Sequence, residues 1–318
     1  MSISEARGSA IIDEVSPPAN APSPQRKVRT RSGLKVSWWF LLPALVFYLF
    51  VTIVPSARGF VYSFTDWNGV RPVINFVGLD NYAKIFTDPA AFSSIGNTLL
   101  FAIAITILQN GIGLALALGA NTLIKSRNVL RVVFFAPAVL TSVVTAFVWK
   151  FIFAPDGPLN TTLASVGLGN LQHDWLGDAT TAQGAVIFST VWQFSGYSMV
   201  IFLAGLQGIP EEIYEAAAVD GAGVWRRFVS IVRPLLAPAI TVNLMLSIIG
   251  GLKTFDQILV LTDGGPGNST ATIASTIYKN AFSYGQFSYG IALAVILTIG
   301  VAIVSAIQYR LLAQQENR

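Results

Sequence analysis

Apolar residues gather in six long runs along the chain, and polar segments separate one run from the next. The runs cover residues 36–54, 98–118, 132–153, 184–206, 237–261 and 290–308. Each is close to the ~20 residues that an α-helix needs to cross a bilayer core of roughly 30 Å. Because backbone in lipid must satisfy its hydrogen bonds internally, the pattern predicts an all-α, polytopic membrane protein with six transmembrane helices.

The composition supports this class. Hydrophobic residues make up 53% of the chain, charged residues make up 11%, and the mean hydropathy is +0.61. A soluble domain with so little charge would stay in solution poorly. The basic residues before the first run are also typical of a secretory leader, but this run ends at Pro55 without a clear small-residue cleavage site. We therefore expect an uncleaved first helix.

The positions of Lys and Arg predict the orientation in the membrane. With the N-terminus inside, the inner segments hold 14 of the 20 basic residues, and the outer loops hold Arg58, Arg71, Lys84 and Lys279. Since cytoplasmic loops are rich in Lys and Arg, both termini are expected in the cytoplasm. Residues 1–33 are rich in proline and small residues, which predicts a disordered cytoplasmic tail. The transmembrane domain is expected over residues 34–312, and a cytoplasmic C-terminal tail over 313–318.

Signatures of catalysis are missing from the sequence. It contains no cysteine and one histidine, His173, so we expect no metal site. It also contains no G-x-x-x-x-G-K-[ST] phosphate loop, no G-x-S-x-G elbow and no H-E-x-x-H pair. We expect a non-catalytic chain that binds no cofactor itself, so any energy for work on a substrate has to come from a partner.

The segment over residues 207–236, between the fourth and fifth runs, has a pattern of its own. Pro210 and the glutamates after it favour a helix start, and Gly221 permits a sharp turn beyond that helix. A second helix is expected to place an apolar face opposite a basic one; its apolar residues are Trp225, Phe228, Val229 and Val232. The segment is either an interfacial connector or a docking surface for another protein.

Several motifs resemble those of one family. The clearest is Glu-Ala-Ala-Ala-Val-Asp-Gly-Ala at residues 215–222, followed by Phe228, Ile231 and Pro234. It resembles the EAA loop of permease subunits of binding-protein-dependent ABC importers. Further landmarks of the resemblance are Gly-Leu-Asp-Asn-Tyr at 78–82, Ala-Gly-Leu-Gln at 204–207 and Leu-Thr-Asp-Gly-Gly-Pro-Gly at 261–267.

The resemblance covers residues 38–312 and is strongest to the carbohydrate-uptake subfamily, on the side of the maltose-type and glycerol-phosphate-type first permeases. The chain departs from the family at Arg233, where leucine is usual, and it lacks the two extra helices and the long outer loop of some maltose-type relatives. The charge of Arg233 can reach the inner interface, so the docking interpretation stands.

What the resemblance implies is a permease core in the bacterial inner membrane that carries a sugar or sugar derivative. It implies four kinds of partner: a second, homologous permease chain, two cytoplasmic ATP-binding subunits that use ATP and Mg²⁺, an extracytoplasmic solute-binding protein, and the sugar. The residues expected to dock the ATPase are Glu215, Ala216, Ala217, Asp220 and Gly221.

Polar and small residues recur on one face of the fourth and fifth runs. In the fifth run the face holds Asn243, Ser247, Gly250, Gly251 and Thr254. Polar groups within membrane spans mark substrate paths, and hydroxyls with an aromatic ring suit a sugar. The path is predicted to include Thr190, Gln193, Tyr197, Ser247, Gly251 and Thr254. Such stripes also mediate close helix packing, and both interpretations stay open.

Lys253 and Asp256 suggest a cation site or proton relay within the fifth run. At ~1.5 Å per residue, however, Lys253 lies about 24 Å from the start of the run, near the outer edge of the bilayer core. An interfacial pair or anchor is therefore expected. The alternative function is an ion-coupled secondary transporter, which predicts buried carboxylates and internal repeats that the sequence does not show. A membrane-embedded enzyme has less support, because no nucleophile, base or metal cluster is evident.

Overall fold

The computed structural model describes residues 38–122 and 126–316, so the predicted tail over residues 1–33 lies outside the described residues. In the described part, the regular secondary structure is helical, apart from one isolated β-bridge between Thr65 and Phe76. This confirms the all-α class. Within the described residues, the chain divides into two units between Val51 and Thr52.

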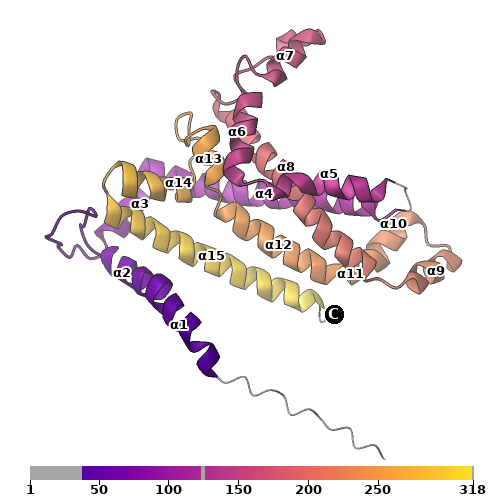
Figure 1. The fold of residues 1–318 in the computed structure, drawn as a ribbon, viewed down its shortest axis with the longest axis horizontal. Coiled ribbons are helices and arrows are strands. Elements are labelled where there is room, and N and C mark those ends of the chain that lie inside the picture. The colour runs from indigo at the N-terminus through magenta and orange to yellow at the C-terminus, as the bar shows by residue number, and fades with distance from the viewer. Residues whose placement is uncertain (1–37, 123–125, 317–318) are drawn as a thin grey trace, which may run out of the picture. The chain divides into compact units, whose positions relative to one another are not determined.

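The helices in chain order are α1 (Leu42–Tyr48), α2 (Val54–Tyr62), α3 (Asp80–Thr87), α4 (Pro89–Ala120), α5 (Arg127–Val139), α6 (Ser142–Ile152), α7 (Pro158–Ser165), α8 (Ala179–Gln207), α9 (Glu211–Val219), α10 (Val224–Arg227), α11 (Arg233–Leu235), α12 (Ala237–Leu252), α13 (Asp256–Leu261), α14 (Ile273–Tyr278) and α15 (Phe287–Glu316) (Figure 1). Short 3-10 turns cover Trp38–Phe40 and Gly169–Leu171, and π-helical turns cover Leu49–Ile53, Phe228–Val232 and Lys279–Ser283.

Four helical segments are each long and apolar enough to cross a membrane: Leu42–Tyr62, Pro89–Ala120, Ala179–Gln207 and Phe287–Arg310. Two bent pairs bring the number to six if each pair is one span. The six predicted runs therefore correspond to the apolar elements of the described chain. The helices extend beyond several of the predicted limits, because polar and small residues at the ends of the runs also adopt helical conformation.

The predicted span over residues 132–153 is not one continuous helix but a bent pair of helices. Helices α5 and α6 meet at an angle of 99°. Pro137 lies near the end of α5, and Leu140 is extended with ψ 146°. Thr141 then starts α6, because its hydroxyl oxygen accepts a hydrogen bond from the backbone N–H of Val144 at 3.3 Å. The chain thus ends one helix and begins another within a few residues.

The predicted span over residues 237–261 is also not one continuous helix. Helix α12 ends at Leu252, after Gly250 and Gly251, and α13 begins at Asp256. At its other end, α12 continues from the α10–α11 segment through a bend of 72°. The break after α12 contains Lys253, Thr254 and Asp256, a short polar interruption that the average hydropathy of the run does not register.

Helix α4 packs along α8 and α12, and α12 also packs on α15 (Figure 1). Two clusters of buried residues lie along these contacts, one with Phe101, Ile105 and Val186, the other with Met199, Phe202 and Leu206. Close approach depends on glycine at the crossing of α5 and α8. A Cβ on Gly196 would lie 1.9 Å from the Phe134 carbonyl oxygen, so any side chain there would push the helices apart.

Candidate functional site

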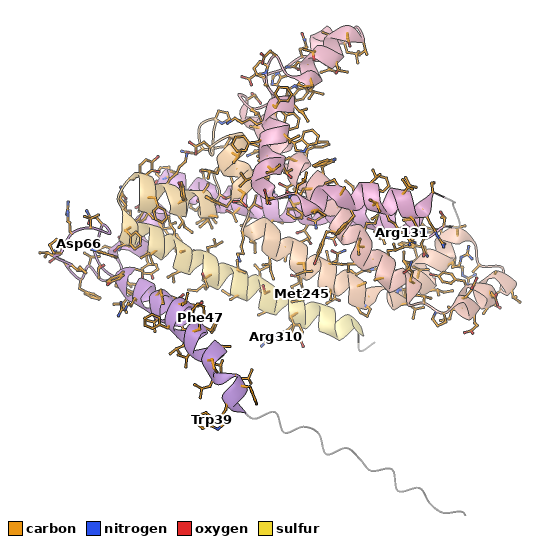
Figure 2. All side chains as sticks on the ribbon, in the orientation of Figure 1. Trp39, Phe47, Asp66, Arg131, Met245 and Arg310 are labelled. Carbon is orange, nitrogen blue, oxygen red and sulfur yellow. The ribbon has the colours of Figure 1, made fainter. Side chains whose placement is uncertain are left out.

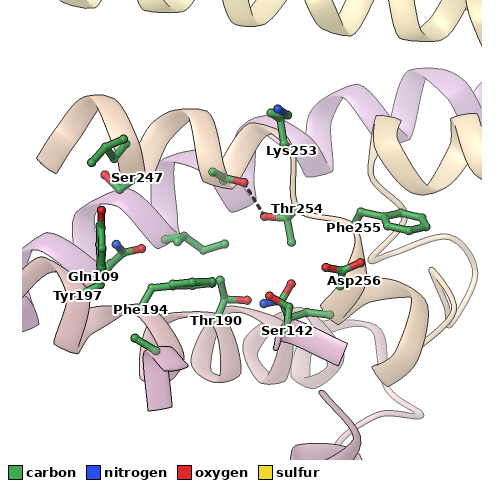
Figure 3. A pocket seen from close by; sticks show the side chains of 16 residues that line it. Gln109, Ser142, Thr190, Phe194, Tyr197, Ser247, Lys253, Thr254, Phe255 and Asp256 are labelled. Atoms are coloured by element: carbon green, nitrogen blue, oxygen red, sulfur yellow. Dashed lines mark hydrogen bonds between the residues drawn. The ribbon is translucent and has the colours of Figure 1, made fainter. Parts of the chain in front are cut away.

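A cavity of 460 Å³ lies where both helix breaks face α4 and α8 (Figure 3). Its walls come from α4, α8, α12, the α5–α6 junction and the α12–α13 connection. The lining residues are Ile105, Gln109, Ala138, Ser142, Thr190, Phe194, Tyr197, Leu246, Ser247, Gly250, Gly251, Lys253, Thr254, Phe255, Asp256 and Gln257. This volume lies within the range of roughly 300–1,000 Å³ typical of small-molecule sites.

Five of the six residues predicted for the substrate path line this cavity: Thr190, Tyr197, Ser247, Gly251 and Thr254. Tyr197 is 43% exposed, whereas the three hydroxyl residues are nearly buried. Thr190 donates its hydroxyl to the Val186 carbonyl within α8 at 2.8 Å. Its remaining acceptor capacity faces the cavity side of the helix. The wall therefore combines one open aromatic ring with nearly buried hydroxyls.

Gln193 is the exception, because it does not line the cavity. Its Nε2 donates to the Leu140 carbonyl oxygen at 2.9 Å, and its Oε1 accepts from Gln257 Nε2 at 3.1 Å. The side chain is 1% exposed. Leu140 lies at the α5–α6 break and Gln257 lies in α13, so Gln193 ties both interrupted regions to α8.

Gly251 and Thr254 differ from the helical stripe that the sequence suggested. A Cβ on Gly251 would lie 2.7 Å from Ala102 Cα of α4, so this glycine serves helix packing as well as the cavity wall. Thr254 lies beyond the end of α12, where its hydroxyl donates to the Gly250 carbonyl at 3.3 Å and its carbonyl accepts from the Thr272 hydroxyl at 2.9 Å. The packing alternative therefore applies to Gly251, and the substrate path stays a prediction.

Sequence reasoning missed several polar and aromatic lining residues, among them Gln109, Ser142, Phe194, Phe255 and Asp256. Gln109 lies in the middle of an apolar run, and a polar residue inside a span is a usable signal. Ser142 and Asp256 are harder to predict, because the amino-acid composition of the runs does not reveal the helix breaks that bring these residues to the cavity. Phe194 and Phe255 look like ordinary lipid-facing residues in the sequence.

The Lys253–Asp256 ion pair does not form. Among the described residues, the salt bridge is formed by Lys279 Nζ and Asp263 Oδ1, which are 3.3 Å apart. Figure 3 shows the Asp256 carboxylate directed toward the cavity and the Lys253 side chain directed away from it. Asp256 therefore offers the cavity a carboxyl group at the start of α13.

Buried polar side chains join α4, α8 and α12 next to the cavity. Gln109 Nε2 donates to Ser198 Oγ at 2.8 Å, and Asn110 Nδ2 donates to Ser247 Oγ at 2.8 Å. Asn243 Nδ2 donates to the Ser198 carbonyl oxygen at 3.0 Å. Hydrogen bonds between spanning helices fix their relative positions in a solvent that cannot replace them. These bonds thus join α4, α8 and α12 beside the cavity.

The predicted docking segment begins with α9, whose first turn carries Glu211 and Glu212 after Pro210, as expected. Helix α9 ends in a Schellman motif. The N–H of Ala222 donates to the Ala217 carbonyl at 2.9 Å, and that of Gly221 donates to the Ala218 carbonyl at 3.1 Å. Gly221 has φ +68°, which confirms the expectation that the turn requires positive φ there.

The predicted docking residues are not all available to a partner. Glu215, Ala216, Asp220 and Gly221 are exposed, but Ala217 is 3% exposed and belongs to the interior. The expectation that the Ala217 side chain meets another surface is therefore corrected. A helix with period 3.6 turns one of two adjacent alanines inward, and the sequence does not say which one.

The second helix of the segment is less regular than predicted. It starts as α10, continues through a π-helical turn over Phe228–Val232 and ends as α11. Of the expected apolar face, Val232 is buried and Phe228 packs on the cluster around Leu206, but Trp225 is 77% exposed. Arg131, labelled in Figure 2, donates from Nη2 to the carbonyl of Ala120 at the end of α4 at 2.9 Å, a favourable place for a cation.

The model of binding-protein-dependent transport system inner membrane components matches residues 109–316. The chain belongs to this family. The matched range holds both helix breaks, the docking segment and most of the cavity wall of this inner membrane component. The family predicted from the motifs is therefore confirmed.

Named relatives of this family are similar over most of their length. The chain is 37% identical to the probable starch degradation products transport system permease protein AmyD of Thermoanaerobacterium thermosulfurigenes, over 88% of this chain and 94% of the relative. It is 37% identical to the multiple sugar-binding transport system permease protein MsmF of Streptococcus mutans, over 86% and 94%. It is 32% identical to the lactose transport system permease protein LacF of Rhizobium radiobacter, over 88% and 96%.

The fold is that of a solved importer permease. A chain of a bacterial ABC transporter involved in the import of the acidic polysaccharide alginate matches with a TM-score of 0.77 and 21% identity, over 87% of this chain and 94% of that chain. A bacterial alginate ABC transporter in complex with an alginate pentasaccharide-bound periplasmic protein also matches with a TM-score of 0.77 and 20% identity. The prediction of an ABC importer permease core is confirmed at the level of the fold.

Proposed function

We propose that this chain is a permease subunit of an ATP-driven ABC importer and that it forms part of the path for a sugar or sugar derivative. Family membership supports transport, and the relatives' names support sugars. The observation that carries the proposal is the cavity at the two helix breaks, because it combines aromatic rings with hydroxyl, amide and carboxylate groups.

The chemistry of the cavity suits a carbohydrate. A sugar ring presents C–H groups on its faces and hydroxyls at its rim, so it pairs with aromatic faces and with hydrogen-bonding groups together. Phe194 and Tyr197 provide rings on α8, while Gln109, Ser142 and Asp256 provide hydrogen-bonding groups from other elements. A carboxylate accepts hydrogen bonds from hydroxyls more strongly than a neutral group does.

Coupling to ATP hydrolysis is assigned to the α9–α11 segment. The exposed residues Glu215, Ala216, Asp220 and Gly221 would form the surface that docks an ATPase subunit. The Schellman motif gives this surface a defined shape, which a partner needs in order to transmit a movement. The docking segment connects α8 to α12, and both helices contribute residues to the cavity wall. A displacement of this segment would therefore move helices that line the proposed sugar site.

The complete transporter would contain a second permease chain, two cytoplasmic ATP-binding subunits and an extracytoplasmic solute-binding protein. ATP and Mg²⁺ would bind to the ATPase subunits, and this chain would bind no cofactor. The proposed orientation has both termini in the cytoplasm. Closing of the ATPases would move the docking segments and shift the permease pair from an inward-facing to an outward-facing state.

The test is sugar uptake by cells that express the whole transporter, with a radiolabelled panel of malto-, cello- and chito-oligosaccharides of two to five units. Uptake should require the solute-binding protein and should stop when the phosphate-binding lysine of the ATPase subunits is replaced. A protonophore should leave it intact over the first seconds. Uptake that survives loss of the ATPase but stops with the protonophore would support an ion-coupled transporter and reject the proposal.

A further inference from the structure

A row of aromatic side chains starts at the cavity and leads away from it. Phe255 lines the cavity, and its ring centroid is 5.5 Å from that of Tyr278. Tyr278 is followed by Phe282 at 5.5 Å, Phe287 at 6.4 Å and Trp67 at 5.1 Å. All these separations lie in the ~4.5–7 Å range of interacting aromatic rings. We call the residues beyond Phe255 the aromatic row.

The aromatic row is not a hydrophobic core. Phe282 is 71% exposed and Tyr278 is 40% exposed, while Phe287 and Trp67 are half-buried. Rings that served packing alone would be covered by neighbouring side chains, as Phe101 and Phe202 are in the helix interfaces. The exposed parts of these rings are therefore not used for packing within the described chain.

Polar groups surround the outer end of the row. The turn directly after Phe282 exposes Ser283, Tyr284 and Gln286. Lys84 Nζ donates to Gln286 Oε1 at 2.8 Å, and Lys279 forms the salt bridge with Asp263. Charged and amide groups at this density belong beside water, because their burial in hydrocarbon is costly. The outer end of the row thus lies next to polar and charged groups that belong beside water.

Hydrogen bonds hold the far end of the row in place. Trp67 Nε1 donates to the Arg71 carbonyl at 3.0 Å, and the Trp67 carbonyl accepts from the N–H of Ser288 at 3.0 Å. The loop that carries Trp67 is closed by Asp66, whose carboxylate accepts from the backbone and side-chain N–H groups of Asn75 at 2.8 and 2.9 Å (Figure 2). Such fixed rings lose little freedom when a ligand stacks on them.

We propose that Tyr278, Phe282, Phe287 and Trp67 bind successive sugar units of an oligosaccharide whose leading end occupies the cavity. The proposal rests on the proposed function. The row begins at a lining residue and consists of rings, which bind the C–H faces of sugars without regard to the pattern of hydroxyls. It therefore selects for chain length, whereas the polar groups of the cavity select for the kind of sugar.

The experiment compares the uptake of labelled disaccharide and pentasaccharide from the panel above, in the series that the wild-type transporter carries. Phe282→Leu keeps an apolar side chain but removes the ring, and Phe282→Tyr restores a ring. Phe282→Leu should leave disaccharide uptake within about twofold of wild type and lower the pentasaccharide rate at limiting concentration about tenfold, the loss of one stacking contact. Phe282→Tyr should restore it.

Phe86→Leu is the matched control, since Phe86 is 68% exposed on α3 and lies outside the row. It should leave both rates unchanged. An equal loss for both sugars in Phe282→Leu, or no loss for either, would overturn the aromatic row while uptake by the wild type still supports the proposed function. A wild-type transporter that carries no member of the panel would instead reject the assignment to oligosaccharides, and the row with it.

Discussion

At the scale of single residues, the cavity depends on side chains that come from opposite sides of two helix breaks. Asp256 carries the one carboxylate among the described lining residues, and its position follows from the end of α12 at Leu252. Had the helix continued, residue 256 would lie on a different face, one turn further along. The presence of a carboxyl group in the cavity lining therefore depends on where α12 ends.

Replacing Asp256 by asparagine tests this chemistry. Asn keeps the shape of the side chain and removes the charge, so a hydrogen bond from a sugar hydroxyl becomes weaker by an amount on the order of 1 kcal/mol. We expect uptake at limiting sugar to fall about fivefold to tenfold. The control is Asp156→Asn, an exposed carboxylate outside the cavity lining. Equal uptake by Asp256→Asn and wild type would remove Asp256 from the sugar site.

At the scale of elements, the sequence predicts the apolar runs but not their interruptions. Hydropathy measures whether a segment can lie in lipid, and it is equally high on both sides of Leu140. Pro137 is visible in the sequence, yet a proline in a spanning helix is compatible with a gentle kink. The angle of 99° depends on contacts from elsewhere in the chain, such as the hydrogen bond from Gln193 to Leu140.

The same limit explains which site residues were predictable. Thr190, Tyr197 and Ser247 follow from helical periodicity because their helices are continuous. Ser142 and Asp256 do not, because each lies next to a break. Gln193 shares a helix face with Thr190 and Tyr197, but it reaches across to the break and Gln257 instead of the cavity.

Gln193→Met tests whether Gln193 holds the two interrupted regions together. Methionine fills a similar volume but leaves the Leu140 carbonyl and the Gln257 amide without their partner, at a cost of ~1–3 kcal/mol for each buried group left unpaired. We expect the melting temperature of the purified protein in detergent to fall by several degrees. Gln207→Met, at an exposed position at the end of α8, should leave it unchanged. A melting temperature of Gln193→Met equal to that of the control would show that the bonds contribute nothing to stability.

Gly221→Val tests the docking segment at the Schellman turn. A β-branched residue resists positive φ, while the absence of atoms within 4 Å of its Cβ position means that no clash contributes. We expect the protein to insert in the membrane but to retain less ATPase subunit in a pull-down, with strongly reduced sugar uptake. Glu215→Lys should have a smaller effect of the same kind.

Two further variants separate backbone strain from simple bulk. Gly221→Asn should be milder than valine, because asparagine tolerates the left-handed region. Gly223→Ala should be neutral, since Gly223 has φ −62° and open space at its Cβ position. Normal pull-down and uptake for Gly221→Val would mean that the segment only connects α8 and α12.

At the scale of the whole molecule, the proposed orientation assigns α7 to the outside and the α10–α11 segment to the cytoplasm. The chain contains no cysteine, so single cysteines report their own accessibility. Ser165→Cys on α7 and Ser230→Cys are both at exposed positions. In intact spheroplasts, a membrane-impermeant maleimide should label Ser165→Cys and should label Ser230→Cys after permeabilisation only. The reverse pattern would invert the orientation and place the docking segment away from any cytoplasmic ATPase.

The contact of Gly251 with Ala102 limits how this cavity can diversify. One wall consists of backbone pressed against a neighbouring helix, where no side chain fits without separating α12 from α4. Tyr197 of α8 also lines the cavity, and its side chain is 43% exposed, so a substitution there meets fewer neighbouring atoms than one at Gly251. Natural mutation or protein design therefore meets a constrained wall at Gly251 and a more tolerant wall at Tyr197. New specificities should arise on α8 before they arise on α12.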